Sequence, residues 1–377
     1  MNRREALLNS LRLIACTALP KTASALLEQP PRPALPPLKT AGACFGAHVG
    51  IAAAKTSLQD PSFARVVVQN FNLITASGMK WNEIHPGPDS YDFAEGDWNM
   101  RFAEENGLEV HGHNLCWNSP ANYPAWFKTV LNKGNAEDFL TGHITTIMKR
   151  YQGRITSWDV VNEPVVPWPG RSDGLYPGVW LDLLGPEYID IAFHAAASAD
   201  PKPLRILNIH HVEQGIADDE LNRGRALALL KQLLARGVPV QAVGIESHLN
   251  AAQPLAAQSF RQFISEVRAL KLQVLVTELD VKETRAVGSS LAWDETVAKY
   301  YGDYLAEVVP VANPRFVIFW TVKDRWEGGG RIQGLMQNNL SPRLTYAAAI
   351  KALRIGSSCD GRKTGLQGQS VYSGAGS

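Results

Sequence analysis

Short runs of apolar and β-branched residues alternate with longer amphipathic stretches along most of the chain. Runs without polar alternation are typical of strands buried on both faces of a parallel sheet. Successive runs begin roughly 25 to 50 residues apart, which leaves room for the helix that each parallel crossover needs. We count eight predicted strands, which begin near Phe45, Phe71, Leu108, Ile155, Arg205, Ala242, Gln273 and Arg315.

The stretches between these runs carry apolar residues three and four positions apart, which is the spacing of a helix with one buried face. Helices are predicted over residues 97–106, 136–151, 188–199, 219–236, 255–270 and 293–309. Gly237 follows the fourth of them and is a favourable C-cap residue. Eight strand and helix pairs favour an α/β fold, a single (β/α)8 TIM barrel, over a doubly wound sheet.

The two ends of the chain lack this alternation. Residues 1–25 resemble a twin-arginine export signal, with Arg3 and Arg4, a modestly apolar stretch and a small-residue cleavage site. Residues 26–41 are too proline-rich for a helix or central strand and predict an extended leader. The barrel is then expected over residues 42–356, and the Gly- and Ser-rich residues 357–377 predict a disordered tail.

The export prediction places the mature protein in the periplasm or outside the cell. An ordinary amphipathic helix is the alternative, because Arg12 interrupts the apolar stretch. Leu13 to Cys16 also resemble a lipoprotein cleavage box that would anchor the chain through Cys16, but the apolar run before it is short. Soluble export is therefore preferred over lipidation. No stretch reaches the roughly 20 apolar residues of a membrane span.

Composition narrows the class of partner. The 37 basic and 36 acidic residues nearly cancel, so charge gives no reason to expect nucleic acid or an anionic membrane as partner. A neutral polymer fits better. Ten Trp and ten Tyr residues offer faces that can stack on sugar rings, although most buried aromatic residues belong to a core.

The four cysteines predict no metal site, because none are paired at a Cys-x2-Cys spacing. Cys44 precedes the first predicted strand and Cys359 follows the last helix, so a disulfide that joins the two ends of the barrel is a hypothesis. Cys116 is expected to be a small buried residue.

Two predicted strands each end at a glutamate, Glu163 and Glu278. The C-terminal ends of the strands are where a TIM barrel carries its active site. Cleavage of an acetal needs a proton at the leaving oxygen and electron density at the anomeric carbon, so one carboxyl must stay protonated while the other stays ionised. The pair therefore predicts a glycoside hydrolase, and a retaining mechanism would place the two carboxyls about 5–5.5 Å apart.

Six segments in order along successive strands resemble glycoside hydrolase family 10, the retaining endo-β-1,4-xylanases. The resemblance covers roughly residues 42 to 355. A single Asn-Glu or Thr-Glu pair would be weak, but six ordered matches are specific. They are Gly78-Met79-Lys80-Trp81, Gly112-His113-Asn114-Leu115-Cys116-Trp117, Trp158-Asp159-Val160-Val161-Asn162-Glu163, Ser247-His248-Leu249, Thr277-Glu278-Leu279-Asp280 and Trp320.

The resemblance implies a role for each matching residue. Glu163 would be the general acid/base, and Glu278 would be the nucleophile that forms a covalent glycosyl-enzyme. His248 would hydrogen-bond the nucleophile, and Asp280 could orient His248. Such a chain would hold Glu278 in position and keep it ionised. No metal and no organic cofactor is expected.

The resemblance also implies contacts to the sugar on the non-reducing side of the scissile bond, from Lys80, His113, Trp117 and Asn162. An aromatic platform beneath that sugar would be formed by Trp320 and by Trp326. The spacing between these two tryptophans is shorter than is usual in the family.

The chain departs from the family pattern at several positions. Residues 75–78 read Thr-Ala-Ser-Gly where a Glu-Asn pair normally binds the second sugar on the glycone side, so that subsite is expected to be weakened. Asn118 stands in place of a histidine and His85 in place of a glutamate. Residues 208–211 read Asn-Ile-His-His instead of Asn-Asp-Tyr-Asn.

The most conspicuous departure is Glu246, where a glutamine is expected. One hypothesis is that this third carboxyl group either raises the pKa of a neighbour or stays protonated itself, and so shifts the pH optimum. The other is that Glu246 pairs with His210 or His211 and only restores a local hydrogen bond. The sequence favours neither.

The predicted function is an endo-1,4-β-xylanase that hydrolyses internal bonds of xylan by double displacement. An alternative is a relative with altered specificity for short, decorated or aryl β-xylosides, because the Glu-Asn pair is missing. A non-catalytic xylan-binding barrel is a third reading, but binding alone requires neither Glu163 nor Glu278. Xylan or xylo-oligosaccharide is the expected partner, and we expect a monomer.

Overall fold

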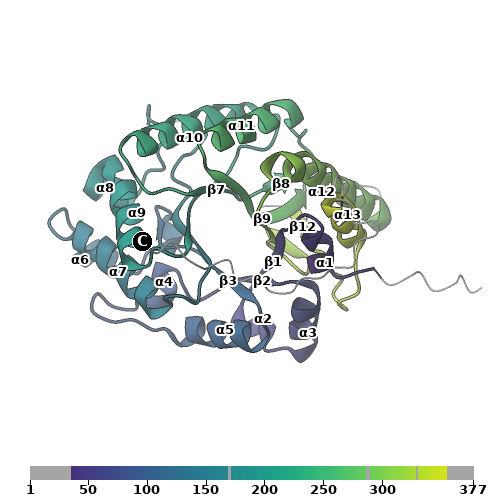
Figure 1. Cartoon of the computed structure of the whole chain (residues 1–377), viewed down its shortest axis with the longest axis horizontal. Coiled ribbons are helices and arrows are strands. Elements are labelled where there is room, and N and C mark those ends of the chain that lie inside the picture. Colours follow the sequence, from purple (N-terminus) through teal and green to yellow (C-terminus); the bar gives the residue numbers. More distant parts are fainter. Residues whose placement is uncertain (1–34, 169–170, 286–288, 328–329, 355–377) are drawn as a thin grey trace, which may run out of the picture. The chain divides into compact units, whose positions relative to one another are not determined.

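The structure is a computed structural model and describes residues 35–168, 171–285, 289–327 and 330–354. Eight parallel strands form a closed barrel in it, because β10 pairs with both β1 and β9 (Figure 1). The predicted (β/α)8 barrel is thereby confirmed, and the strands start close to the predicted positions. They are β1 (His48–Ala53), β2 (Leu73–Ala76), β3 (Glu109–Gly112), β5 (Ser157–Asn162), β6 (Leu204–Ile209), β7 (Ala242–Ile245), β9 (Gln273–Glu283) and β10 (Phe316–Phe319).

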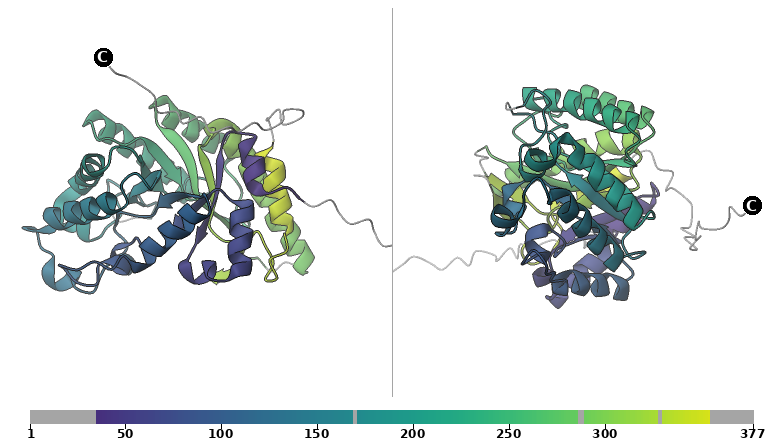
Figure 2. Two further views of the ribbon diagram at one scale, coloured as in Figure 1. Left: turned by 60° about the horizontal axis from the view of Figure 1, so that its bottom comes forward. Right: turned by 90° about the vertical axis from the view of Figure 1, so that its left-hand side faces the viewer.

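Helices surround these strands on the outside of the barrel (Figures 1 and 2). All six predicted helices are present. The longer helices are α3 (Pro61–Asn70), α5 (Ala94–Glu105), α7 (Ala136–Arg150), α9 (Tyr188–Ala199), α10 (Ala217–Ala235), α11 (Ala257–Ala269), α12 (Ser290–Ala312) and α13 (Leu344–Leu353). The shorter ones are α1 (Leu38–Ala43), α2 (Lys55–Leu58), α4 (Trp81–Ile84), α6 (Phe127–Val130) and α8 (Val179–Leu184).

Four further strands lie at the barrel rim. They are β4 (Cys116–Trp117), β8 (His248–Asn250), β11 (Arg325–Glu327) and β12 (Gly330–Gln333). β4 continues the parallel pairing next to β5, and β8 does so next to β9. β12 pairs antiparallel with the end of β9, which carries this long strand beyond the barrel.

The apolar residues divide into two buried clusters. The larger one lies between the strands and the helices. The smaller one fills the barrel interior, with side chains from β2, β6, β7, β9 and β10. Because the interior is packed with side chains rather than hollow, a site can form only where this packing stops, at the ends of the strands. The interior cluster consists of Leu73, Leu204, Ile206, Ala242, Leu275, Phe316 and Ile318.

Ordered and buried residues lie before residue 42, the predicted start of the barrel. Helix α1 occupies part of the range expected to be an extended leader, and its Leu38 and Ala41 are buried. The hydroxyl of Tyr346, on the last helix, donates a hydrogen bond to the carbonyl oxygen of Pro36 at 3.0 Å. The proline-rich composition concealed this short helix, whose burial depends on contacts with the opposite end of the chain.

The other predictions for the chain ends fall on residues that the structure does not describe. Cys44 is disulfide-bonded and Cys116 is buried and not disulfide-bonded. Cys359 lies outside the described residues, so its pairing with Cys44 stays a prediction. The export signal and the tail also lie outside them. Within the described ranges, no helix is both long and apolar enough to cross a bilayer.

Candidate active site

A cavity of about 560 Å³ opens at the C-terminal ends of the barrel strands. Its lining contains all the predicted site residues except Glu246 and Trp326. The residues brought together are Lys80, His113, Trp117, Asn162, Glu163, His248, Glu278, Asp280 and Trp320. These residues come from six segments of the sequence, and only the closed barrel makes them neighbours.

Irregular strand geometry precedes both predicted catalytic carboxyls. The pairing register of β5 with β6 shifts between Asp159 and Val161, just before Glu163. The register of β9 against β10 shifts between Val276 and Leu279, around Glu278. Such bulges occur near active sites because they redirect a side chain that would otherwise follow the strict alternation of a strand. Glu163 also has a φ of 49°, in the left-handed region.

Glu278 is nearly buried, with an exposed fraction of 4%. The side-chain amide of Asn208 donates a hydrogen bond of 2.9 Å to its Oε1, and His248 Nε2 lies 3.3 Å from its Oε2. His113 Nδ1 lies 3.6 Å from Oε1. Burial raises the pKa of Glu278, but the attraction of His113 and His248 outweighs it, so the pKa lies below its ordinary value.

His248 is held in turn by Asp280. His248 Nδ1 lies 3.0 Å from Asp280 Oδ1, and Arg325 donates a hydrogen bond of 2.9 Å to Asp280 Oδ2. Partial desolvation lowers the pKa of His248, but Asp280 and Glu278 raise it well above its ordinary value. The expected Glu278–His248–Asp280 chain is therefore present, and it places a positive charge beside Glu278.

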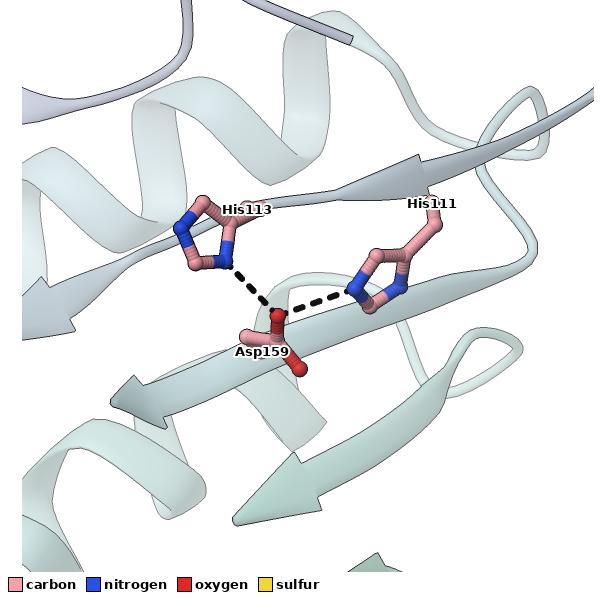
Figure 3. A group of neighbouring side chains, drawn as sticks. All are labelled: His111, His113 and Asp159. Atoms are coloured by element: carbon pink, nitrogen blue, oxygen red, sulfur yellow. Dashed lines mark hydrogen bonds and ion pairs between the residues drawn. The ribbon is translucent and has the colours of Figure 1, made fainter. Parts of the chain in front are cut away.

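A second histidine is fixed from below by a group that the sequence interpretation did not identify. His111 Nε2 and His113 Nδ1 each lie 2.9 Å from the same oxygen of Asp159, Oδ2 (Figure 3). Burial raises the pKa of Asp159, but the two histidines overcome it and lower the pKa to about 2. Because Nδ1 of His113 faces Asp159, the ring is fixed with its Nε2 edge pointing away from that carboxylate.

The pKa of Glu163 is displaced in the opposite direction to that of Glu278. Burial raises the pKa of Glu163 to about 7, and the negative charge of Glu278 acts in the same direction. At slightly acidic pH, Glu163 is therefore protonated while Glu278 is ionised. Because their pKa values are displaced in opposite directions, Glu163 can act as an acid while Glu278 acts as a base in the same cavity.

With this geometry established, similarity to known proteins is informative. The model of the family described as Glycosyl hydrolase family 10 matches residues 38–352. The chain belongs to this family. It is 32% identical over 311 residues to endo-1,4-beta-xylanase 2 of Claviceps purpurea, covering 81% of this chain and 86% of the relative. It is 29% identical over 333 residues to endo-1,4-beta-xylanase B of Thermotoga neapolitana, covering 83% of this chain and 90% of the relative.

Solved structures from the family share the fold. Native xylanase 10B from Thermotoga maritima superposes with a TM-score of 0.74 and 30% identity, covering 84% of this chain and 98% of that one. Xylanase 10B from Thermotoga petrophila RKU-1, in complex with xylobiose, gives a TM-score of 0.74 and 29% identity, covering 85% and 98%. The family resemblance read from the motifs is thereby confirmed.

The side chains around Glu163 and Glu278 contact one another. Lys80 Nζ lies 5.4 Å from the centroid of the Trp117 ring. Asn208 donates a hydrogen bond of 2.8 Å to Asn162 Oδ1, so one amide contacts both Asn162 and Glu278. The Trp320 and His113 rings lie in a T-shaped arrangement, with the ring centroids 5.3 Å apart.

The structure does not bring Trp326 to the cavity. This residue lies on β11 at the rim and is 78% exposed, whereas Trp320 lines the cavity. The aromatic platform expected from two tryptophans therefore contains one of them. A tryptophan only six positions after Trp320 falls on β11, which pairs with β12 outside the eight barrel strands, and residue spacing alone did not indicate this pairing.

Glu246 lies just below the cavity with an exposed fraction of 2%. Its Oε2 is 3.9 Å from His210 Nδ1 and 3.9 Å from His248 Nε2. Asn208 donates a hydrogen bond of 3.3 Å to its Oε1. His211 is not its partner, because Nδ1 of that ring lies 3.6 Å from Asp219. Burial raises the pKa of Glu246 well above its ordinary value, and the charges of Glu278 and Glu163 add to this.

The residues that the sequence interpretation missed share one property. Asp159 and His111 face the barrel interior from β5 and β3, and Asn208 does so from β6. His111 and Asn208 each lie two positions before a residue named from the sequence, His113 and His210, whereas a register shift after Asp159 breaks the alternation in β5. Inward alternation along a barrel strand was the available signal, because residues two apart lie on the same face.

Proposed function

We propose that this protein is an endo-1,4-β-xylanase that hydrolyses internal bonds of xylan with retention of configuration. The observation that carries the proposal is the opposite displacement of the pKa values of Glu163 and Glu278 in one cavity. The names of the similar proteins, all xylanases, and the xylobiose in one of their structures support the choice of substrate.

In the proposed mechanism, Glu278 attacks the anomeric carbon while Glu163 gives its proton to the leaving oxygen. The carbon–oxygen bond to the leaving sugar breaks, and an ester forms between the sugar and Glu278. This ester carries no charge, so the pKa of Glu163 falls once Glu278 is esterified. Glu163 can then take a proton from the water that cleaves the ester, which restores both groups.

The surrounding residues are assigned by position. His248 and Asn208 hold the two oxygens of Glu278, so that one oxygen can be directed at the anomeric carbon. Lys80, Asn162 and His113 present polar groups to the sugar bound on the glycone side. Trp320 supplies the apolar surface on which a sugar face can stack.

A time course with purified protein and xylohexaose tests this proposal. We expect early products of intermediate length, and we expect them to appear first as the β-anomer in proton NMR spectra. The Glu278→Ala variant should release none of them. Adding azide to that variant should restore cleavage of an aryl xyloside and give the inverted α-xylosyl azide, because azide can occupy the space of the missing carboxylate.

Three other results would contradict the proposal in different ways. Release of single xylose units from the wild-type protein would indicate the altered specificity that the sequence of residues 75–78 suggested. Binding of xylohexaose without cleavage by either protein would indicate a carbohydrate-binding barrel. Inverted products from the wild-type protein would exclude Glu278 as a nucleophile while leaving hydrolysis intact.

We also propose that residues 1–25 direct export of the protein, on the basis of their sequence pattern. Fractionation of cells that produce the full chain should find the activity outside the cytoplasm. An Arg3→Lys, Arg4→Lys double variant should retain it inside the cell. A Cys16→Ala variant separates the two routes, because it should change the distribution between membrane and soluble fractions only if Cys16 carries a lipid.

A further inference from the structure

The active site contains a third carboxyl group, Glu246, to which the proposed mechanism assigns no role. One oxygen of Glu246 lies within 4.8 Å of an oxygen of Glu163, and the same holds for Glu246 and Glu278. His210 Nδ1 is 3.7 Å from Glu163 and 3.9 Å from Glu246, so the ring lies against both groups. On the other side, His248 lies against both Glu246 and Glu278.

We propose that Glu246 is a positioning residue for proton transfer. As the pH rises, Glu246 can lose its proton in place of Glu163, and its negative charge then keeps Glu163 protonated to higher pH. This inference rests on the proposed function, because it assigns Glu163 as the acid. Glu246 does not line the cavity and is not expected to contact substrate. It would act only through its charge on Glu163.

The groups around Glu246 are close enough for a charge on it to change their protonation. Glu246 is buried near Glu163 and Glu278, with Asp159 deeper in the barrel, and one histidine lies beside each of the pairs that Glu246 forms with the first two. A new negative charge there is screened less than at the surface and therefore acts strongly on its neighbours. The groups are Glu163, Asp159, Asn208, His210, His248 and Glu278, from the segments that follow or belong to β5, β6, β8 and β9.

Consider the site as pH rises with Glu278 already ionised. Glu163 and Glu246 are then two protonated groups beside one negative charge, and either can lose a proton next. Loss from Glu246 leaves Glu163 protonated and competent, and the new charge makes its remaining proton harder to remove. Because a glutamine cannot lose a proton, this competent form does not exist in a Glu246→Gln variant.

The test is the pH dependence of kcat/KM for xylohexaose in the wild-type protein and in Glu246→Gln. We expect the alkaline limb of the variant to move to lower pH by roughly half a unit. The acid limb should stay in place, because at that pH position 246 is uncharged in both proteins, as a protonated glutamate in one and as a glutamine in the other. Glu246→Asp, which retains an ionisable group, should keep an alkaline limb closer to that of the wild type.

Glu213→Gln is the matched control. Glu213 is also 2% exposed with a raised pKa caused mainly by burial, but its oxygens accept hydrogen bonds from the backbone of Val212 and Ser247. Replacing it removes a buried carboxyl that lies next to Asp219 and His211 rather than against Glu163 or Glu246. We expect this variant to alter stability and to leave the position of the alkaline limb unchanged.

A second measurement does not depend on turnover or on the variant. Carbon-13 NMR of the wild-type protein with labelled glutamate should show the Glu163 carboxyl signal changing in two steps above the pH at which Glu278 ionises, because in that range it senses both its own proton loss and that of Glu246. A single-step titration of Glu163, or an alkaline limb that Glu246→Gln does not move, would overturn the inference. Absence of any xylan cleavage would contradict the proposed function, while the NMR titration would still decide whether the two carboxyls are coupled.

Discussion

At the scale of single residues, identical side chains behave differently because their neighbours differ. Glu278 is nearly buried, yet two histidines and an amide surround its oxygens and favour the ionised form. Glu163 lies in the same cavity without a comparable set of donors, so burial and the charge of Glu278 favour the protonated form. The chemistry therefore depends on which histidine lies against which carboxyl.

This difference predicts a bell-shaped pH dependence of kcat/KM for the wild-type protein. Activity should rise as Glu278 ionises, below the ordinary pKa of a glutamate, because its pKa is lowered. Activity should fall as Glu163 loses its proton, with half of the maximum near pH 7, because its pKa is raised to about 7. Initial rates at low xylohexaose concentration measure both limbs. An alkaline limb near pH 4 to 5 would show that Glu163 is not the acid.

Replacing Glu163 by glutamine predicts an effect that depends on the leaving group. Natural xylan needs a proton at the leaving oxygen, so kcat/KM should fall by about 10²–10⁴-fold in Glu163→Gln. A dinitrophenyl xylobioside leaves without protonation, so its first step should be nearly unaffected. The slow second step should then produce a burst of dinitrophenol in a stopped-flow trace. Equal losses for both substrates would indicate a structural role for Glu163.

At the scale of elements, the strands were predictable and the local irregularities within them were not. Buried β-branched runs such as residues 274–277 indicate a strand in a parallel sheet whatever their partners are. The register shifts in β5 and β9 depend on how each strand meets its neighbour in the closed barrel. These shifts orient Glu163 and Glu278, so the sequence located the two residues while leaving their orientation undetermined. The position of Trp326 was missed for the same reason, because it depends on the pairing of β11 with β12.

One glycine at the element scale connects strand packing to the site. Asn208 on β6 can reach both Asn162 and Glu278 because Gly244, on the adjacent β7, has no side chain. A Cβ at Gly244 would lie 2.2 Å from Asn208 Oδ1 and 2.8 Å from Thr277 Cγ2. Both side chains are buried and linked by a hydrogen bond of 2.7 Å, so neither can move away easily.

Gly244→Ala should therefore lower the free energy of unfolding by about 1–3 kcal/mol. It should also lower kcat by on the order of tenfold, because Asn208 would shift relative to Glu278. Denaturant unfolding and steady-state kinetics measure the two effects. Gly302→Ala is the control, because it lies in α12 with only an ordinary contact of 3.7 Å, and there alanine should stabilise the helix by up to about 1 kcal/mol. Unchanged kinetics in Gly244→Ala would show that Asn208 need not be held in place.

At the scale of the whole molecule, the fold class followed from counting strands, while the boundary of the folded part did not. Composition shows where proline is frequent, but burial depends on which distant residues are adjacent. Leu38 is fully buried, and Tyr346 bonds to Pro36 and lies 2.5 Å from Asn70 Oδ1. These contacts connect the beginning of the folded part to α3 and to α13, the last helix of the described chain. No local pattern contains that information.

The two possible starting points of the barrel make a testable difference. A chain that begins at residue 42 lacks α1 and its buried Leu38, whereas a chain that begins at residue 36 retains both. Loss of one fully buried leucine costs about 2–5 kcal/mol, and removing the helix also leaves apolar surface of α13 uncovered. The shorter chain should therefore unfold at a temperature lower by roughly 5 to 10 °C.

The active site should not change in the same experiment, because every residue assigned to it lies at or after Lys80 and none contacts α1. We expect the pH dependence of kcat/KM at 25 °C to be the same for both chains, when rates are expressed per folded molecule. Thermal unfolding monitored by circular dichroism measures the difference, with the full chain as reference. Equal unfolding temperatures would mean that the barrel closes without α1, and that residue 42 is the functional start of the fold after all.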